Sequence, residues 1–600
     1  MTEEELLRAH APILRCTSGE LFLPADAERY IAACDLWMGR SQREARLVAP
    51  LGTLTPDRLG TLRPDPGHRF WLRLVQRPMR GVELTRWWRR ADRPMFHAAG
   101  RLARVGLFAR VVDAAFNVSL LVRGSVPGGT AAAAWEKYRA AVEGERRPVA
   151  YGRVVRRDGW IALHYLYFYF MNDWRTTFGG ANDHEADWEQ VFVVLEDGAD
   201  GATPVWVAAA AHDEVGDDLR RHWDDPQLER DGGHPVLYVG AGSHATYFRP
   251  GEYITAAPLP GLARLHGFLD GVRAFWRDTL RQADPGDLAA RLQGWFSIPF
   301  IDYARGDGIS IGAGQELEWD PRPIGDELPW VHGYRGLFGL DTHDRFAGER
   351  APAGPKYTRD GDVRRSWHDP LGWAGLSKVA PPSRAPELIR ERIAALGASL
   401  SELSVRERTL ADELPRLNLE ADALRDAGSP LRLQEEATTR VLRAEEELAG
   451  LRASMADLAL RLEAAATELD PSAVETLADP RGHLRHVREP VAPEVVRYGV
   501  LVELWSAVGF GLLLLAVIGL LLFAGVPVWS AVLLSLAIYV GVEAAFRRRI
   551  VGMLLRVTLI LGFVAALILV WEFAGALLVA ALVALALLTI TDNVRELRRR

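Results

Sequence analysis

The chain is poor in cysteine, with Cys16 and Cys34 as the only two among its 600 residues. Two cysteines cannot build the disulfide framework of a small secreted protein, and this pair does not form a Cys-x-x-Cys unit. The acidic first five residues are followed by no uninterrupted apolar core, so we expect no secretory signal peptide. These absences favour a soluble part that folds in a reducing compartment.

Common catalytic signatures are missing as well. The sequence holds no Gly-x-Ser-x-Gly elbow, no phosphate-binding loop of the Walker type and no His-Glu-x-x-His helix. A large excess of charge is also absent, because 71 basic and 78 acidic residues give a formal net charge of −7. A charge that small for this length argues against nucleic acid as a general partner, and we expect none.

Long apolar runs occur in the last hundred residues, at about 498–524, 528–546, 550–570 and 573–591. Each run has close to the roughly 20 residues that a helix needs to span the hydrocarbon core of a membrane. The sequence therefore predicts four transmembrane helices over residues 497–600. The runs offer few polar side chains at membrane depth, which favours an anchor over a pore.

Basic residues are distributed unevenly around these runs. They precede the first run, separate the second from the third and follow the fourth, in the segments 481–497, 547–549 and 595–600. The other two connections, around Pro527 and Glu572, carry no Lys or Arg. The positive-inside rule therefore predicts a multi-pass integral membrane protein with both termini and the soluble head in the cytoplasm.

A leucine repeat precedes the membrane domain, over residues 384–470. The first arm has apolar residues at heptad spacing, at Ile393, Leu396, Leu400, Leu403, Leu410, Leu414, Leu417, Ala421 and Leu424. The second arm keeps the same three-four spacing, at Leu448, Leu451, Met455, Leu458, Leu462, Ala465 and Leu469. A Gly-Ser-Pro turn signal at 428–430 separates them, so we expect an antiparallel coiled-coil hairpin. The register is equally compatible with a homo-oligomer, and a basic linker, 471–496, leads on to the membrane.

The segment 183–189 reads Asp-His-Glu-Ala-Asp-Trp-Glu and runs into a strand-like stretch. Alternate side chains of a strand share a face, so Asp187 and Glu189 point the same way, and His184 can fold back beside them. One imidazole with two carboxylates suits Mg²⁺, Ca²⁺ or Mn²⁺ better than Zn²⁺. We therefore predict a divalent-cation site here. The alternative is a turn of solvated charges that enters a strand.

The same segment carries a family resemblance. His184 and the run Asp187-Trp188-Glu189 resemble the Gly-His-Arg-His-Asp-Trp-Glu heptapeptide of the necrosis-inducing-peptide-like (NLP) toxins. Further blocks are similar to the vacuolar-protein-sorting proteins of the Vps sixty-two type, at 10–15, 21–24, 163–173, 205–212 and 235–251. The resemblance covers roughly residues 5–30 and 150–345. It implies an NLP-like β-sandwich, and it implies that Asp173, which ends the aromatic block, is the fourth metal ligand.

The heptapeptide itself is altered, since Asp183, Glu185 and Ala186 replace the glycine and both basic residues of the toxins. The metal-binding residue types survive this change, whereas toxin-like target recognition need not. Alternating apolar strands with intervening turns support a sandwich independently of the resemblance. We therefore expect an α+β protein whose head, residues 1–380, is an antiparallel β-sandwich with helical insertions at about 66–145 and 260–296.

An arginine-rich segment stands out at residues 69–123, where twelve arginines and three acidic residues give a local charge of 12 − 3 = +9. Tryptophans are interleaved with the arginines, and basic amphipathic helices with aromatic residues favour anionic membrane surfaces. The residues expected at the membrane surface are Arg86, Trp87, Trp88, Arg89, Arg90 and Arg93. The alternatives are nucleic-acid contact and a purely structural helical insertion.

Together these features favour a membrane-anchored protein whose head binds a polar ligand, a glycan or a lipid headgroup, through a divalent cation at the membrane surface. A metal-dependent hydrolase is the first alternative, with His212 as general base and His244 as a second candidate. The second alternative is a scaffold in which the coiled coil recruits partners and the metal is structural. Membrane lipids are expected partners in each case.

Overall fold

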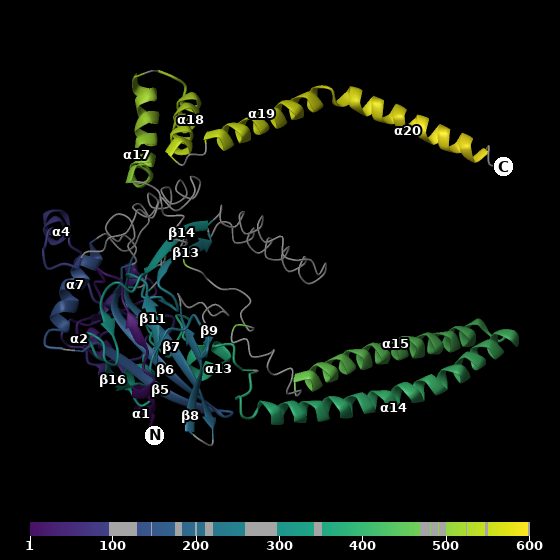
Figure 1. Cartoon of the computed structure of the whole chain (residues 1–600), viewed down its shortest axis with the longest axis horizontal. Coiled ribbons are helices and arrows are strands. Elements are labelled where there is room, and N and C mark those ends of the chain that lie inside the picture. The colour runs from purple at the N-terminus through teal and green to yellow at the C-terminus, as the bar shows by residue number, and fades with distance from the viewer. Residues whose placement is uncertain are drawn as a thin grey trace. The chain divides into compact units, whose positions relative to one another are not determined.

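The computed structural model divides the chain into two compact units. The first comprises residues 1–97, 119–255 and 301–491, and the second comprises 98–118, 256–300 and 492–600. Within them the structure describes residues 1–94, 129–145, 147–173, 183–198, 201–210, 220–258, 297–340, 351–377, 379–468, 481, 490, 500–523, 525–546 and 550–597. The first unit contains an α+β head and a long helical hairpin, and the second contains apolar helices (Figure 1).

The head is built around a six-stranded sheet with the order β16-β5-β6-β7-β8-β9. Its strands are β5 (Val149–Arg157), β6 (Trp160–Asn172), β7 (His184–Gly198), β8 (Gly201–Ala209), β9 (Arg220–His222) and β16 (Asp320–Pro323). Neighbours from β5 to β9 pair antiparallel, whereas β16 pairs with β5 in parallel. A parallel neighbour requires a long crossover instead of a hairpin. This edge therefore departs from the purely antiparallel arrangement that the sequence predicts.

Smaller sheets complete the strands that the structure describes. A mixed sheet contains β1 (Ile13–Arg15), β10 (Arg230–Asp231), β11 (His234–Val239), β12 (Thr246–Tyr247) and β15 (Ser310–Ile311). A three-stranded sheet contains β2 (Asp35–Gly39), β3 (Arg46–Ala49) and β4 (Arg69–Arg73). The strands β13 (Gly251–Pro258) and β14 (Ser297–Ala304) pair with each other. Because β1 pairs in parallel with β11, the first strand of the chain lies beside the block 235–251.

Short helices accompany these sheets. They are α1 (Glu3–Ala9), α2 (Ala27–Ala32), the 3-10 helix η1 (Gln42–Glu44), α3 (Pro56–Thr61), α4 (Gly81–Trp88), α7 (Thr130–Ala141), α11 (Pro329–Gly333), α12 (Arg365–His368) and α13 (Pro370–Trp373). The first expected helical insertion therefore starts later than residue 66, because Phe70, Trp71 and Leu72 are buried in strand β4. Residues 95–128 and the second expected insertion, 260–296, lie outside the described residues.

Strand β6 forms the centre of the core, and all 13 of its residues are buried. On one face Phe168 and Phe170 pack edge-on against Tyr30 of α2, with ring centroids 5.0 and 5.1 Å apart. On the other face Tyr167 stacks on Trp319 at 5.2 Å. A strand covered on both sides carries apolar or aromatic residues at every position instead of alternating ones. The long aromatic run of the sequence is therefore a central strand.

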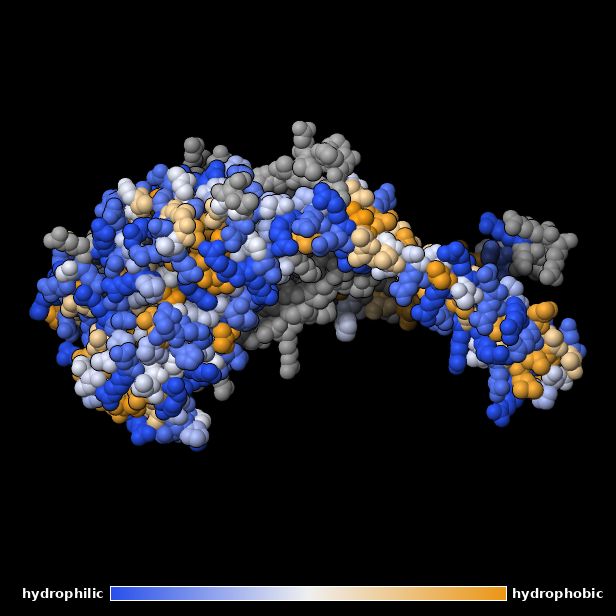
Figure 2. All heavy atoms as spheres, turned by 90° about the horizontal axis from the view of Figure 1, so that it is seen from below, coloured by the Kyte–Doolittle hydropathy of each residue, from blue (hydrophilic) through white to orange (hydrophobic). Residues whose placement is uncertain are grey.

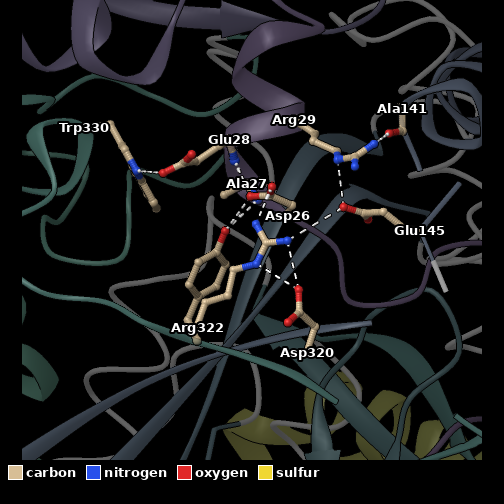
Figure 3. A network of polar contacts seen from close by, with 10 residues as sticks. Asp26, Ala27, Glu28, Arg29, Ala141, Glu145, Asp320, Arg322 and Trp330 are labelled. Carbon is tan, nitrogen blue, oxygen red and sulfur yellow. Dashed lines mark hydrogen bonds and ion pairs between the residues drawn. The ribbon is translucent and has the colours of Figure 1, made fainter. Parts of the chain in front are cut away.

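A network of polar contacts fastens α2 to the edge strand β16 (Figure 3). Asp26 is the N-cap of α2, and its Oδ1 accepts hydrogen bonds from the backbone N–H of Glu28 and from the hydroxyl of Tyr151, both at 2.8 Å. The Oδ2 atom accepts from Nη1 of Arg322 at 2.6 Å, and Arg322 also pairs with Asp320 at 2.9 Å. The buried charge of Asp26 is thus paired and fully hydrogen-bonded, as buried charges must be.

Two long helices follow the head, α14 (Ala385–Asp426) and α15 (Leu431–Glu468), and they run side by side in Figure 1. Three ion pairs join them in antiparallel order, Arg406–Glu447, Glu407–Arg452 and Glu420–Arg440. Every residue of the expected leucine seam on α14 is buried or half-buried, and on α15 the same holds from Leu448 to Ala465. The apolar seam of one helix is therefore covered by the other within the same chain.

The second unit contains α17 (Val500–Phe523), α18 (Val528–Phe546), α19 (Ile550–Glu572) and α20 (Ala574–Leu597). Three helices in the described part of the chain are long and apolar enough to cross a membrane, through Val528–Ala545, Ile550–Leu569 and Ala574–Arg595. The apolar part of α17 is shorter, Gly511–Phe523.

Large apolar side chains are exposed along most of α18, α19 and α20. By contrast, the face of the molecule in Figure 2 is mostly hydrophilic, with scattered apolar side chains. Soluble monomers rarely expose apolar surface of this extent, and a lipid bilayer is the solvent that suits it. These helices make the chain a membrane protein.

Candidate metal centre

Strands β6 and β7 place two of the expected metal ligands on one face of the sheet. Tyr167 pairs with Glu189 across the two strands, and Tyr169 pairs with Asp187. Because side chains alternate along each strand, both carboxylates lie on the face that carries these two tyrosines. The backbone of Ala186 just before them has a left-handed φ of 60°. The regular strand backbone of β7 is therefore interrupted just before Asp187.

One group of three potential metal ligands meets closely within the ranges that the structure describes. It consists of Glu20, Asp173 and His244, each with a donor atom within 4.8 Å of the other two. Glu20 follows β1, Asp173 follows β6, and His244 lies in the loop between β11 and β12. The side chains of all three are almost completely buried. The fold thus gathers one imidazole and two carboxylates from three distant parts of the chain.

The loop after β11 aims His244 at this group. His244 has a left-handed backbone with φ of 57°, and its N–H donates to the carbonyl of Gly240 at 2.9 Å. Gly242 also has a positive φ, and a Cβ there would lie 2.5 Å from the carbonyl oxygen of Asp173. Its N–H donates to Glu20 at 2.8 Å, while its carbonyl accepts from the N–H of Asp173 at 3.0 Å. Backbone strain of this kind clusters at functional sites.

Asp187 lies behind His244 and orients its ring. Its Oδ2 is 2.9 Å from Nδ1 of His244 and accepts a hydrogen bond from the side-chain amide of Asn172 at 3.0 Å. Burial by itself would lower the pKa of His244, but the contacts with Asp187 and Glu20 outweigh it and raise the pKa to about 9. Carboxylates behind metal-bound histidines fix the ring in the same manner. The other ring nitrogen of His244, Nε2, faces Glu20 and lies 3.8 Å from its Oε1.

Several buried polar atoms beside the group make no hydrogen bond with the rest of the described chain. They are Nε2 of His244, Oγ of Ser243, Oδ1 of Asn172 and the hydroxyl oxygen of Tyr169. Buried polar atoms are nearly always satisfied, so a cluster of exceptions requires an explanation. Nitrogen and carboxylate donors that lie within 4.8 Å of one another match the coordination preferences of a small divalent cation. The residues therefore fit a metal ion.

The other expected site residues are placed differently. His184 and Glu189 are buried on β7 but do not belong to the group of three. Nδ1 of His184 is 2.8 Å from the carbonyl oxygen of Ala186, so this ring is held by the local backbone. His212 lies outside the described residues. Sequence reasoning missed Glu20, whose only signal is its place between two blocks that carry the family resemblance.

Glu185 has a structural role in the head. Its carboxylate accepts hydrogen bonds from the backbone N–H groups of Leu74 at 3.1 Å, Val75 at 2.7 Å and Leu340 at 3.2 Å. Burial raises the pKa of Glu185 to about 6, although these hydrogen bonds oppose the rise. Glu185 therefore ties the segment after β4 and residue 340 to β7.

The six residues expected at the membrane surface divide into two sets. Trp87 is buried against Trp135 of α7, with ring centroids 5.9 Å apart, whereas Arg90 and Arg93 are partly exposed and held by contacts within the head. Arg93 covers the Trp87 ring at 4.9 Å, and Arg90 forms ion pairs with two acidic side chains. The other three, Arg86, Trp88 and Arg89, are exposed.

Comparison with known proteins adds no assignment. No family model matches the chain, and no curated protein or solved structure matches it either. The similarity to the NLP and Vps-type proteins therefore rests on the short motifs alone.

Proposed function

We propose that the protein is a membrane-anchored binding protein whose head holds a divalent cation and binds a polar ligand through it, a glycan or a lipid headgroup, at the membrane surface. The observation that carries this proposal is the meeting of Glu20, Asp173 and His244 in the head. The buried Nε2 of His244 supports it, because this atom makes no hydrogen bond within the described chain and faces Oε1 of Glu20 at 3.8 Å, where a cation would contact both.

Three side chains would hold the cation, through Nε2 of His244 and the carboxylates of Glu20 and Asp173. Asp187 would keep the imidazole in position through Nδ1. Oxygen donors outnumber nitrogen in this set, which favours Mg²⁺, Ca²⁺ or Mn²⁺ over Zn²⁺. A bound cation supplies a positive charge that attracts hydroxyl or phosphate oxygens of a ligand.

Metal analysis of the full-length protein in detergent tests the proposal. We expect about one equivalent of divalent cation in the wild type and none in Asp173→Ala/His244→Ala, because that variant loses two of the three chelating side chains. Asp187→Asn should weaken binding by about 10–100-fold, as is usual for groups that orient a ligand.

Asp35→Asn is the matched control for this experiment. Asp35 is also buried and accepts a hydrogen bond from the indole of Trp37 at 2.9 Å, but it does not belong to the group. The control should therefore keep its metal. Wild-type protein that binds no Mg²⁺, Ca²⁺ or Mn²⁺ stoichiometrically would contradict the cation site.

The burial of the group favours a second candidate function, a scaffold with a structural cation. His244 is fully buried and Asp173 is 3% exposed, so a cation there could join the segments after β1, β6 and β11 without meeting a ligand. The two functions predict different losses when a chelator removes the cation. A ligand-binding cation is required for glycan or headgroup binding, whereas a structural cation chiefly raises the unfolding temperature of the head.

We interpret the α14–α15 hairpin as an antiparallel coiled coil and the packed sheets of the head as a sandwich.

We further propose a four-span anchor in which α17 is the first span, and a cytoplasmic head whose exposed Arg86, Trp88 and Arg89 contact lipid. The arginine distribution supports this orientation, because the connections after α17 and after α19 carry no basic residue.

Thiol labelling of intact cells tests this topology. A cysteine introduced at Phe573, between α19 and α20, should react with a membrane-impermeant reagent, whereas one at the exposed Ser401 of α14 should not. The native Cys16 and Cys34 are buried, and burial raises the pKa of both thiols, so they add no background. Labelling of Ser401→Cys with protection of Phe573→Cys would reverse the orientation.

A further inference from the structure

A large cavity in the head lies apart from the metal centre. Its volume is about 1500 Å³, and it is lined by residues from the end of β2, the start of β4, the segments after α3 and α11, and residues 357–362. It shares no residue with Glu20, Asp173, Asp187 or His244. Small-molecule sites occupy clefts of roughly 300–1,000 Å³, so this cavity can take a ligand the size of a sugar phosphate or larger.

The lining of this cavity is strongly basic in an otherwise acidic protein. Five arginines line it, Arg40, Arg63, Arg69, Arg335 and Arg359. Two aspartates, Asp360 and Asp362, oppose them, so the local charge is 5 − 2 = +3 with the two lining histidines neutral. The whole chain has a formal charge of −7. A concave wall with an excess of positive charge concentrates the field and attracts anions.

Four of these arginines have no acidic partner among the residues that the structure describes. Arg40, Arg63, Arg69 and Arg335 form no ion pair with any residue in the described ranges, whereas arginines elsewhere in the head, such as Arg29 and Arg46, do. Like charges that converge without acidic partners repel each other. Such an arrangement is stabilised when an anion occupies the space between them.

Two of the arginines are held in place by uncharged contacts. Nη1 of Arg63 donates to the carbonyls of Gly60, Leu62 and Gly333, at 2.9, 2.8 and 3.3 Å. The guanidinium of Arg335 stacks over the ring of Tyr357 at 4.8 Å. Their planar groups are therefore positioned before a ligand arrives, which lowers the entropy lost on binding.

The β2–β4 pair supplies two further arginines from one end of a sheet. Gly39 pairs with Arg69 across these strands, so Arg40 and Arg69 start from adjacent backbones. Gly67, with φ of +74°, also lines the cavity, and a Cβ there would lie 3.9 Å from Nε of Arg40, so this part of the backbone lies beside the Arg40 side chain. Arginine forks are usual partners of phosphate oxygens.

We propose that this cavity binds a small molecule with several phosphate groups, either free in solution or as the headgroup of a phosphorylated lipid. The guanidinium groups of Arg40, Arg63, Arg69 and Arg335 pair with the phosphate oxygens. This site does not depend on the proposed cation. It gives the head an anion-binding function of its own.

Calorimetric titration of the full-length protein in neutral detergent, with inositol hexakisphosphate as the soluble probe, tests the proposal. We expect saturable binding that weakens with added salt. Arg40→Gln/Arg69→Gln should lose about tenfold to a hundredfold in affinity for each charge-assisted contact removed. Arg40→Lys/Arg69→Lys should fall between them and the wild type, because lysine keeps the charge but not the bidentate fork.

Arg43→Gln/Arg156→Gln is the matched control, because it removes the same charge from exposed positions outside the cavity. It should bind like the wild type. The cavity variants should also unfold at the same temperature as the wild type or higher, since they relieve repulsion.

A second experiment distinguishes a lipid headgroup from a free phosphorylated molecule. The protein is placed in nanodiscs of neutral lipid, with or without phosphatidylinositol bisphosphate, and the soluble probe is titrated again. Competition by the lipid assigns a membrane headgroup, and unchanged affinity assigns a free phosphorylated molecule. Failure of the wild type to bind either probe at low salt, or an equal loss in the control variant, overturns the proposal. Neither result bears on metal content, so the two sites are tested independently.

Discussion

Glu185→Ala should lower the free energy of unfolding of the head by about 3–5 kcal/mol, because each buried N–H left without an acceptor costs roughly 1–3 kcal/mol. Three such donors depend on this carboxylate, the N–H groups of Leu74, Val75 and Leu340. The loss is partly offset, since the substitution also removes a buried charge. Urea unfolding of the detergent-solubilised protein, followed by tryptophan fluorescence, measures the change. The head dominates this signal, because 16 of the 19 tryptophans precede residue 500.

Glu185→Gln distinguishes the contribution of the hydrogen-bond acceptor from that of the negative charge. Glutamine keeps one carbonyl oxygen in nearly the same position, so this variant should lose distinctly less stability than Glu185→Ala. The matched control is Glu196→Ala, farther along β7, where the carboxylate accepts from the backbone N–H of Ser383 in an exposed contact. It should change stability by less than about 1 kcal/mol, as substitutions at exposed sites usually do. Equal effects of Glu185→Ala and Glu196→Ala would refute the anchoring role.

Asp26→Ala should destabilise the head by about 2–4 kcal/mol, since it removes both a helix N-cap and one partner of a largely buried ion pair. The carboxylate accepts from the N–H of Glu28 and from Arg322, as Figure 3 shows, and also from the hydroxyl of Tyr151. Without it, α2 loses its cap and Arg322 loses its closest charged partner. The expected result is a lower unfolding midpoint of the head in the same urea experiment.

Asp320→Asn provides the comparison for Asp26. Asp320 pairs with the same arginine at 2.9 Å, but its side chain is 42% exposed, so water screens the interaction. Exposed ion pairs contribute about 0–1 kcal/mol, and this variant should stay within that range. A loss as large as that of Asp26→Ala would show that the pairing with Arg322, and not the cap or the burial of Asp26, controls stability here.

Some features of this protein follow from local sequence. The apolar runs from residue 528 onward predict helices long enough to span a membrane, and α18, α19 and α20 confirm this, because length and composition suffice for such a helix. The leucine spacing of 393–424 correctly indicates which side of α14 is covered, since the period of a helix determines which residues share a face. Alternation in β7 places Asp187 and Glu189 together for the same reason.

The arrangement of the candidate sites depended on tertiary structure. Asp187 and His184 stand close in sequence and suggest one ligand set, yet the described atoms that converge belong to Glu20, Asp173 and His244. The arginines of the cavity likewise come from segments around residues 40, 69, 335 and 359, and no spacing relates them. Periodicity acts over a few residues within one element. These contacts depend instead on the parallel pairing of β1 with β11, the pairing of β2 with β4 and the left-handed backbone at His244, which are decided only when distant segments pack together.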